Sequence, residues 1–182
     1  MQWYINNGQT DHLIETGIDL YKLPLQEKKD ILCSCIYGID IDIHAVEVAK
    51  FSLLIKLIED ETAPSVAEVV PILPDLGDNI QFGNSLVSQT ELNGISSANR
   101  QMMEIAPFDW STINNGCGFD VIIGNPPYVN TEGMHALLPS AEVEVYKKKY
   151  KTSHKQFDKY FIFIEQAINK INENGLVCYI CL

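Results

Sequence analysis

The feature of this sequence with the clearest chemical potential is a short apolar run that ends in a rigid polar loop. Phe119 to Gly124 has the composition of a strand, and Asn125-Pro126-Pro127-Tyr128 follows at once. The loop offers an amide side chain, a backbone carbonyl beside two prolines and an aromatic ring within four residues. Such a set suits the binding of a flat heterocycle that carries an amino group.

The loop could also activate that amino group for methyl transfer. An exocyclic nitrogen on an aromatic ring attacks a methyl donor poorly, because its lone pair is delocalised. If the Asn125 side-chain oxygen and the Pro126 carbonyl accept its two hydrogens, the lone pair is freed. Fixed dipoles of this kind lower a barrier by ~3–4 kcal/mol per group. The two prolines hold the loop, and Tyr128 could stack on a base swung out of a duplex.

Two other predicted strands end in polar residues. Residues 36–41 end at Asp40, and Asp42 is placed to cap the helix that residues 45–58 predict by their apolar spacing. A short strand over residues 79–83 ends at Asn84. Ligands of open α/β sheets bind beyond the carboxyl ends of the strands, so these side chains and Asn125 are expected to line one crevice.

These two polar residues each have a plain structural alternative. Asp40 could accept hydrogen bonds from both ribose hydroxyls of a nucleoside, or it could simply help to open the following helix. The Asn84 carbonyl oxygen could accept from an adenine amino group, or the residue could only form a turn.

The alternation of strands and helices predicts an α/β fold with a mainly parallel sheet. Because residues 121–124 are apolar at every position, they predict a strand covered on both faces. Residues 88–118 predict a long excursion, and residues 131–155 a polar, mobile segment.

The end of the sequence predicts one more helix and one more strand. Residues 157–171 have amphipathic spacing, with Asp158 as a candidate cap and Asn174-Gly175 as a stop signal. Residues 176–182 then predict an apolar strand.

Composition limits the classes of function. The chain has 182 residues, the length of one domain, and shows neither a membrane span nor a signal peptide. Its net charge of −11 leaves any grip on nucleic acid to a local basic cluster, residues 147–155, which could also be a solvated loop. Five cysteines without an export signal predict reduced thiols in the cytoplasm. Cys178 and Cys181 have the spacing of half a zinc site, although core thiols are favoured.

Together these motifs resemble the adenine-N6 DNA methyltransferases of the gamma arrangement. More closely, they resemble the methylases of type IIG restriction–modification enzymes and related phage-defence methylases. Residues 37–42 are similar to the family's ribose-binding strand, and residues 83–86 to its adenine-binding turn, where the family more often has Asp than Asn84. Residues 119–129 resemble the catalytic loop, and residues 150–165 the segment that follows it.

The resemblance implies S-adenosylmethionine as methyl donor and a flipped adenine in double-stranded DNA as acceptor, with no metal. Asn125 and Pro126 would polarise the amino group, Pro127 would fix the loop, and Tyr128 would stack on the base. For the donor, Asp40 would hold the ribose, Ile41 would pack on the cofactor adenine, and Asn84 would bind its amino group.

The resemblance also implies a partial Rossmann-like methyltransferase fold that lacks its first and last strands. Residues 1–35 are expected to be a helical lead-in without the family's Gly-rich cofactor loop, and residues 36–182 the partial catalytic domain. We therefore expect the chain to be part of a longer protein with a separate target-recognition domain. The strands ending at Asp40 and Gly124 should then pair directly, or a second copy should associate through their open edges.

Two other functions remain open at this point. Methyltransferases with the same loop also modify protein glutamine side chains or RNA bases. Alternatively, the chain could be a non-catalytic remnant or assembly module that keeps the shell of a methyltransferase.

Overall fold

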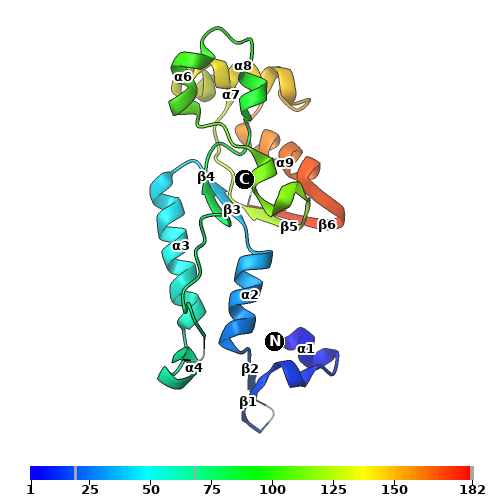
Figure 1. Cartoon of the computed structure of the whole chain (residues 1–182). Helices are drawn as coiled ribbons and strands as arrows, with labels where there is room; N and C mark the ends of the chain where they lie inside the picture. Colours follow the sequence, from blue (N-terminus) through cyan, green and yellow to red (C-terminus); the bar gives the residue numbers. More distant parts are fainter. Residues whose placement is uncertain (19, 68, 181–182) are drawn as a thin grey trace. The chain divides into compact units, whose positions relative to one another are not determined.

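A computed structural model describes residues 1–18, 20–67 and 69–180 (Figure 1). The chain divides into two compact units, Met1–Gly38 with His44–Ile80 and Ile39–Ile43 with Gln81–Leu182. Each unit has its own cluster of buried apolar side chains. The sequence predicts one partial domain, and the folded chain places that sequence in two units.

The first unit combines helices with a small hairpin. Its elements are α1 (Gln2–Asn6), the short 3-10 turn η1 (Thr10–His12), β1 (Ile14–Gly17), β2 (Leu20–Lys22), α2 (Leu25–Cys35), α3 (Ile43–Ile58) and α4 (Ala63–Ala67). Strands β1 and β2 pair antiparallel. The expected helical lead-in therefore contains two helices, α1 and α2, and also a hairpin that the sequence pattern did not indicate.

Helix α3 forms where its apolar spacing predicts it. It begins at Ile43, directly after Asp42, and its predicted stripe faces the core: Val46 and Leu57 are buried, with Ala49 and Leu53 packed against the same cluster. A second apolar stripe of α3 is exposed, and it consists of Val48, Phe51, Ile55 and Ile58.

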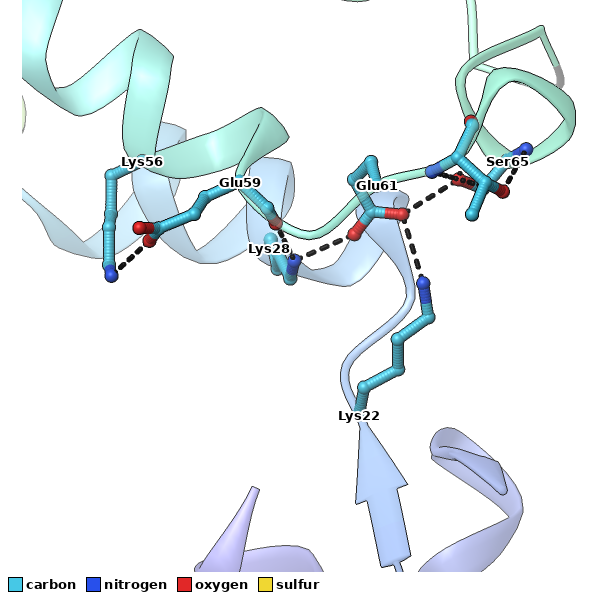
Figure 2. A network of polar contacts seen from close by, with 7 residues as sticks. Lys22, Lys28, Lys56, Glu59, Glu61 and Ser65 are labelled. Atoms are coloured by element: carbon cyan, nitrogen blue, oxygen red, sulfur yellow. Dashed lines mark hydrogen bonds and ion pairs between the residues drawn. The ribbon is translucent and has the colours of Figure 1, made fainter. Parts of the chain in front are cut away.

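A buried carboxylate ties the first unit together (Figure 2). The Glu61 side chain is only 1% exposed and pairs with Lys28 at 2.7 Å and Lys22 at 3.1 Å. Ser65 donates a third hydrogen bond to it at 2.8 Å. Burial raises the pKa of Glu61, but the hydrogen bonds from these three residues outweigh burial and hold the pKa at about 2.

The remaining strands form two separate two-stranded sheets. Strand β3 (Gly38–Asp40) pairs with β4 (Ile80–Phe82), and β5 (Phe119–Gly124) pairs in parallel with β6 (Ile171–Tyr179). The mixed α/β class with parallel pairing is as predicted. Direct pairing of the strands that end at Asp40 and Gly124 was a wrong prediction for the part of the chain described, since they lie in different sheets.

Strand β5 differs from its prediction in burial. Ile123 is 76% exposed and Val121 is also exposed, so the strand is not covered on both faces. On β6, Leu176 and Val177 are exposed too. The apolar sequence of β5 correctly predicts a strand, but coverage depends on what packs against it, and no described element covers these side chains.

Helices fill the segments that the sequence left as loops. These are α5 (Gln89–Leu92), α6 (Ala98–Ile105), α7 (Thr131–Leu137) and α8 (Ser140–Lys149), with 3-10 turns η2 (Trp110–Thr112) and η3 (Asn114–Gly116). Helix α9 (Lys159–Lys170) lies where residues 157–171 predict a helix. The prediction of a mobile segment over residues 131–155 is wrong, because Met134, Val145 and Tyr146 are fully buried in the largest core cluster. The apolar residues of this segment are interspersed with lysines and glutamates, so the sequence does not show the pattern of a buried helix.

The bounds of the last helix, α9, differ from the predicted ones. Asp158 precedes α9 as expected, but its side chain makes no capping hydrogen bond. The helix stops at Lys170, and Asn174, with φ 66°, lies at an irregularity inside β6 rather than at the helix end. Cys178 is a free, exposed thiol, so the prediction of a core thiol is wrong for this residue. Cys181, the other half of the Cys pair, lies outside the described residues. None of the helices in the described ranges is long and apolar enough to cross a membrane.

Candidate active site

The Asn125–Tyr128 loop leaves the carboxyl end of β5, as the sequence predicts. Gly124, the last strand residue, accepts a hydrogen bond from Ile180 N–H at 3.1 Å. A side chain at Gly124 would meet the Tyr179 ring, whose Cε1 atom lies 3.0 Å from an ideal Cβ position. The end of β5 is therefore packed closely against the end of β6, and this fixes the point at which the loop begins.

Asn125 is exposed, whereas Pro126 is buried. Across residues 1–18, 20–67 and 69–180, the Asn125 side chain has no hydrogen-bond partner, so its amide oxygen is available to a ligand. Burial of Pro126 anchors the loop that carries this amide. The pair thus provides one free acceptor on a fixed backbone.

Two contacts fix the Tyr128 side chain. Its hydroxyl donates to the Ile180 carbonyl at 2.7 Å, and its ring meets the Tyr160 ring edge-on at a centroid distance of 6.3 Å. A cavity of about 490 Å³ lies against it, lined by Tyr128, Val129, Asn130, Gly133, Leu137, Asp158 and Tyr160. The ring is therefore fixed in orientation and borders an open space that would admit a nucleobase.

The exit of the loop is clamped to the start of α9. Lys159 N–H donates to the Val129 carbonyl at 2.8 Å, and Asn130 forms a bridge with Asp158. Thr131 Oγ1 accepts from Phe157 N–H at 2.8 Å and donates to the Phe157 carbonyl at 2.9 Å. These bonds fix the loop from both sides, since β5 holds its entrance.

Asp40 and Ile41 lie at the end of β3, both exposed. Asp40 Oδ1 accepts from Asp42 N–H at 2.8 Å, which orients the carboxylate and leaves Oδ2 for another donor. The Ile41 side chain is 53% exposed and offers an apolar surface beside that carboxylate. The Asp40 carbonyl accepts from Gly83 N–H at 2.8 Å, so the turn that contains Asn84 begins beside Asp40.

Asn84 is buried in a turn that is held from several elements. Its Oδ1 accepts from Leu86 N–H at 3.1 Å, and its Nδ2 donates to Glu142 Oε1 at 3.1 Å. The Leu86 carbonyl accepts from the Tyr150 hydroxyl at 2.7 Å. Burial raises the pKa of Tyr150, which keeps that hydroxyl a donor. The turn is consequently rigid, and the Asn84 amide has a defined orientation.

Sequence reasoning did not find Glu142 or Lys159. Glu142 belongs to the segment predicted to be polar and mobile, and Lys159 lies within residues 150–165, where the resemblance assigned it no role. The structure places the Glu142 carboxylate against Asn84 and the Lys159 ammonium 3.4 Å from Glu142. Glutamate is usually exposed on a helix surface, so the sequence gives no sign that Glu142 is buried.

Two lysines of the basic cluster at residues 147–155 make contacts within the protein. Lys149 pairs with Glu91 at 2.8 Å and also donates to the Leu86 carbonyl at 3.0 Å. Lys148 pairs with Glu144 on the same helix at 2.6 Å. Lys149 therefore supports the Asn84 turn, and a phosphate contact by the rest of the cluster stays a prediction.

Comparison with known proteins identifies the family of the chain. Residues 34–182 match the family described as Eco57I restriction-modification methylase, so the chain belongs to that family. It is 44% identical over 180 residues to the type II restriction enzyme and methyltransferase RM.Eco57I of Escherichia coli, which covers 99% of the chain. It is 35% identical over 63 residues, or 35% of the chain, both to the type II methyltransferase M.PaeR7I of Pseudomonas aeruginosa and to M.BstVI of Geobacillus stearothermophilus.

The chain spans only a small part of these relatives. The match covers 17% of RM.Eco57I and 10% each of M.PaeR7I and M.BstVI. The matches therefore establish the family of the chain, and the activity of the whole protein is a proposal.

Proposed function

We propose that the protein is a site-specific DNA methyltransferase of a restriction–modification or phage-defence system, which transfers a methyl group from S-adenosylmethionine to the N6 amino group of adenine. The observation that carries this proposal is the Asn125–Tyr128 loop at the end of a parallel strand, with an exposed amide side chain and a fixed aromatic ring. Membership of the Eco57I methylase family supports the same chemistry. The enzyme would act on DNA in the cytoplasm.

In this function the loop binds the acceptor. Asn125 Oδ1 and the Pro126 carbonyl accept the two amino hydrogens of an extruded adenine, which moves nitrogen lone-pair density toward the methyl donor. Pro127 limits the loop to one conformation. Tyr128 stacks on the base. Its hydrogen bond to Ile180 and its ring contact with Tyr160 already restrict the side chain, so little motion is lost on binding.

The donor-side residues fit a nucleoside. Asp40 has a free carboxylate oxygen for ribose hydroxyls, and Ile41 has exposed apolar surface for the cofactor adenine. Asn84 is buried with its oxygen already bonded to Leu86 N–H, so a contact with the adenine amino group would use the second lone pair of that oxygen. When bound, S-adenosylmethionine supplies an electrophilic methyl group.

Transfer of labelled methyl groups tests the proposal. The full-length protein is incubated with labelled S-adenosylmethionine and plasmid DNA, tRNA or a release factor in parallel, and N6-methyladenine is measured in the DNA. We expect label in DNA, and a loss of about 10²–10³ in kcat for Asn125→Ala. Label in tRNA or release factor instead would support the rival methyltransferases, and no label at all would support a non-catalytic module.

The exposed apolar strand surface suggests an additional property. The side chains of Val121, Ile123, Leu176 and Val177 are exposed on β5 and β6. Exposed apolar strands at a sheet edge recruit other strands. Residues 1–182 alone would therefore self-associate through β5 and β6, which sedimentation at increasing concentration measures. Ile123→Lys should reduce the association, and a monomer at all concentrations would contradict it.

A further inference from the structure

A buried polar cluster surrounds the Asn84 side chain. Glu142, in the first turn of α8, is 3% exposed, and its Oε1 accepts from Asn84 Nδ2 at 3.1 Å. The same oxygen accepts from the Tyr146 hydroxyl and lies 3.4 Å from Lys159 Nζ. The Lys159 ammonium also lies over the Tyr146 ring, 5.5 Å from its centroid. Each buried polar side-chain atom among the described residues has a partner.

The charges in this cluster fix the orientation of the Asn84 amide. An ionised carboxylate only accepts hydrogen bonds, so the group that faces Glu142 must be the Asn84 NH₂. The Asn84 oxygen is thereby turned toward Leu86 N–H, 3.1 Å away. Leu86 N–H, a donor, favours the same orientation, so the amide is held from both sides: a half-turn would set its nitrogen against Leu86 N–H and its oxygen against the Glu142 carboxylate.

The cluster also explains why Asn occupies position 84. An Asp there would place one carboxylate oxygen where Nδ2 lies, 3.1 Å from Glu142 Oε1. Two buried carboxylates at that separation cannot both be ionised without a large cost. Lys159, the cation that pairs with Glu142, has the charge to balance one of them.

The cluster reaches the acceptor loop through the same lysine. The Lys159 side chain pairs with Glu142, and its backbone N–H donates to the Val129 carbonyl at 2.8 Å, one residue after Tyr128. Asn84, Glu142 and Lys159 therefore form a continuous chain of polar contacts that ends at the Asn125–Tyr128 loop.

We propose that Glu142 is a positioning residue for the donor half of the site: together with Leu86 N–H it fixes the orientation of the Asn84 amide, whose oxygen would accept from the cofactor adenine, and it makes Asn, not Asp, the residue required at position 84. Lys159 balances the Glu142 charge and sets this residue pair at a fixed distance from the acceptor loop. The ligand part of the proposal rests on the proposed methyltransferase function. The pairing of Asn84 with Glu142 does not.

A double-mutant cycle in the full-length protein tests both parts. Asn84→Asp should lower the melting temperature and raise the KM for S-adenosylmethionine about tenfold, with a smaller change in kcat. Glu142→Gln in the same molecule should restore most of both losses, because Gln donates to the new carboxylate. Glu144→Gln is the matched control: it removes an exposed acid of the same helix that pairs with Lys148 on the surface, so it should not rescue Asn84→Asp.

The outcomes separate the two claims. Failure of Glu142→Gln to rescue the melting temperature overturns the pairing. Rescue of the melting temperature without rescue of the KM overturns the role of Glu142 toward the cofactor. If no variant and no wild-type protein methylates DNA, yet the melting temperature is rescued, the proposed function fails and the pairing stands.

Discussion

The Tyr128 hydroxyl donates a hydrogen bond to the Ile180 carbonyl at 2.7 Å, so the last residue of the acceptor loop is fixed to the chain just beyond β6. Tyr128 and Ile180 are 52 residues apart in sequence, and the parallel pairing of β5 with β6 brings them together. The aromatic ring is thus oriented by the sheet itself. Tyr128 therefore has two roles that can be tested separately: its hydroxyl fixes the loop, and its ring would stack on the base.

Tyr128→Phe and Tyr128→Ala should differ accordingly. The Phe variant keeps the ring and loses only the bond to Ile180, a net cost of about 0.5–1.5 kcal/mol in stability. The Ala variant also loses stacking on the base, worth ~1–3 kcal/mol. We expect kcat/KM for DNA to fall less than about tenfold for Phe and further for Ala. Equal losses in the two variants would show that the ring does not contact the base.

Gly83 should tolerate no side chain, because it lies where the Asn84 turn packs on Phe108. Its φ is +155°, and an ideal Cβ would lie 2.9 Å from Phe108 Cδ2 and 3.1 Å from Phe108 Cβ. Gly83→Ala should therefore cost about 1–3 kcal/mol of stability, measured by urea unfolding. Gly94→Ala is the control, since Gly94 has φ +84° but nothing within 4 Å of the added Cβ. The cost at Gly94 should be smaller, and an equal cost would mean that backbone strain alone decides.

Glu61 should make the first unit sensitive to acid. Its folded-state pKa of about 2 lies below the value of ~4.3 expected in the unfolded chain, so its stabilisation is complete above that value. It is lost as pH falls from about 4 to about 2, by up to about 3 kcal/mol. Urea unfolding at a series of pH values would measure this loss.

The matched variants locate the pH effect. Glu61→Gln should flatten the pH dependence in that window, because no carboxylate remains to protonate. Glu47→Gln removes an acid that is 64% exposed and pairs with Lys50 at 3.1 Å on the surface of α3. It should leave the dependence almost unchanged. A steep acid transition that persists in Glu61→Gln would contradict the assignment.

Residues 1–182 alone are expected to bind S-adenosylmethionine weakly or not at all. In the proposed function Asp40, Ile41 and Asn84 would supply ribose and adenine contacts, while residues 1–35 contain no Gly-rich loop of the kind expected for the methionine part of the cofactor. Calorimetric titration of the isolated chain should detect no micromolar binding. A micromolar Kd would show that these three residues suffice.

The sequence by itself determined the local chemistry of the site. The Asn125–Tyr128 loop, the strand before it and the α3 helix after Asp42 follow from neighbouring residues, because periodicity, prolines and caps act over a few positions. The family resemblance on these motifs was confirmed by the match over residues 34–182.

Only the tertiary structure decided which distant groups meet. Glu142 and Lys159 lie 58 and 75 residues beyond Asn84, and no local pattern indicates that their charges meet there. The same holds for the packing of α7 and α8, which a polar composition concealed. Burial of strands likewise depends on what lies across the sheet, so the apolar sequence of β5 could not predict that Ile123 is exposed. Local sequence sets which conformations are possible, whereas long-range contacts set which charges and surfaces are paired.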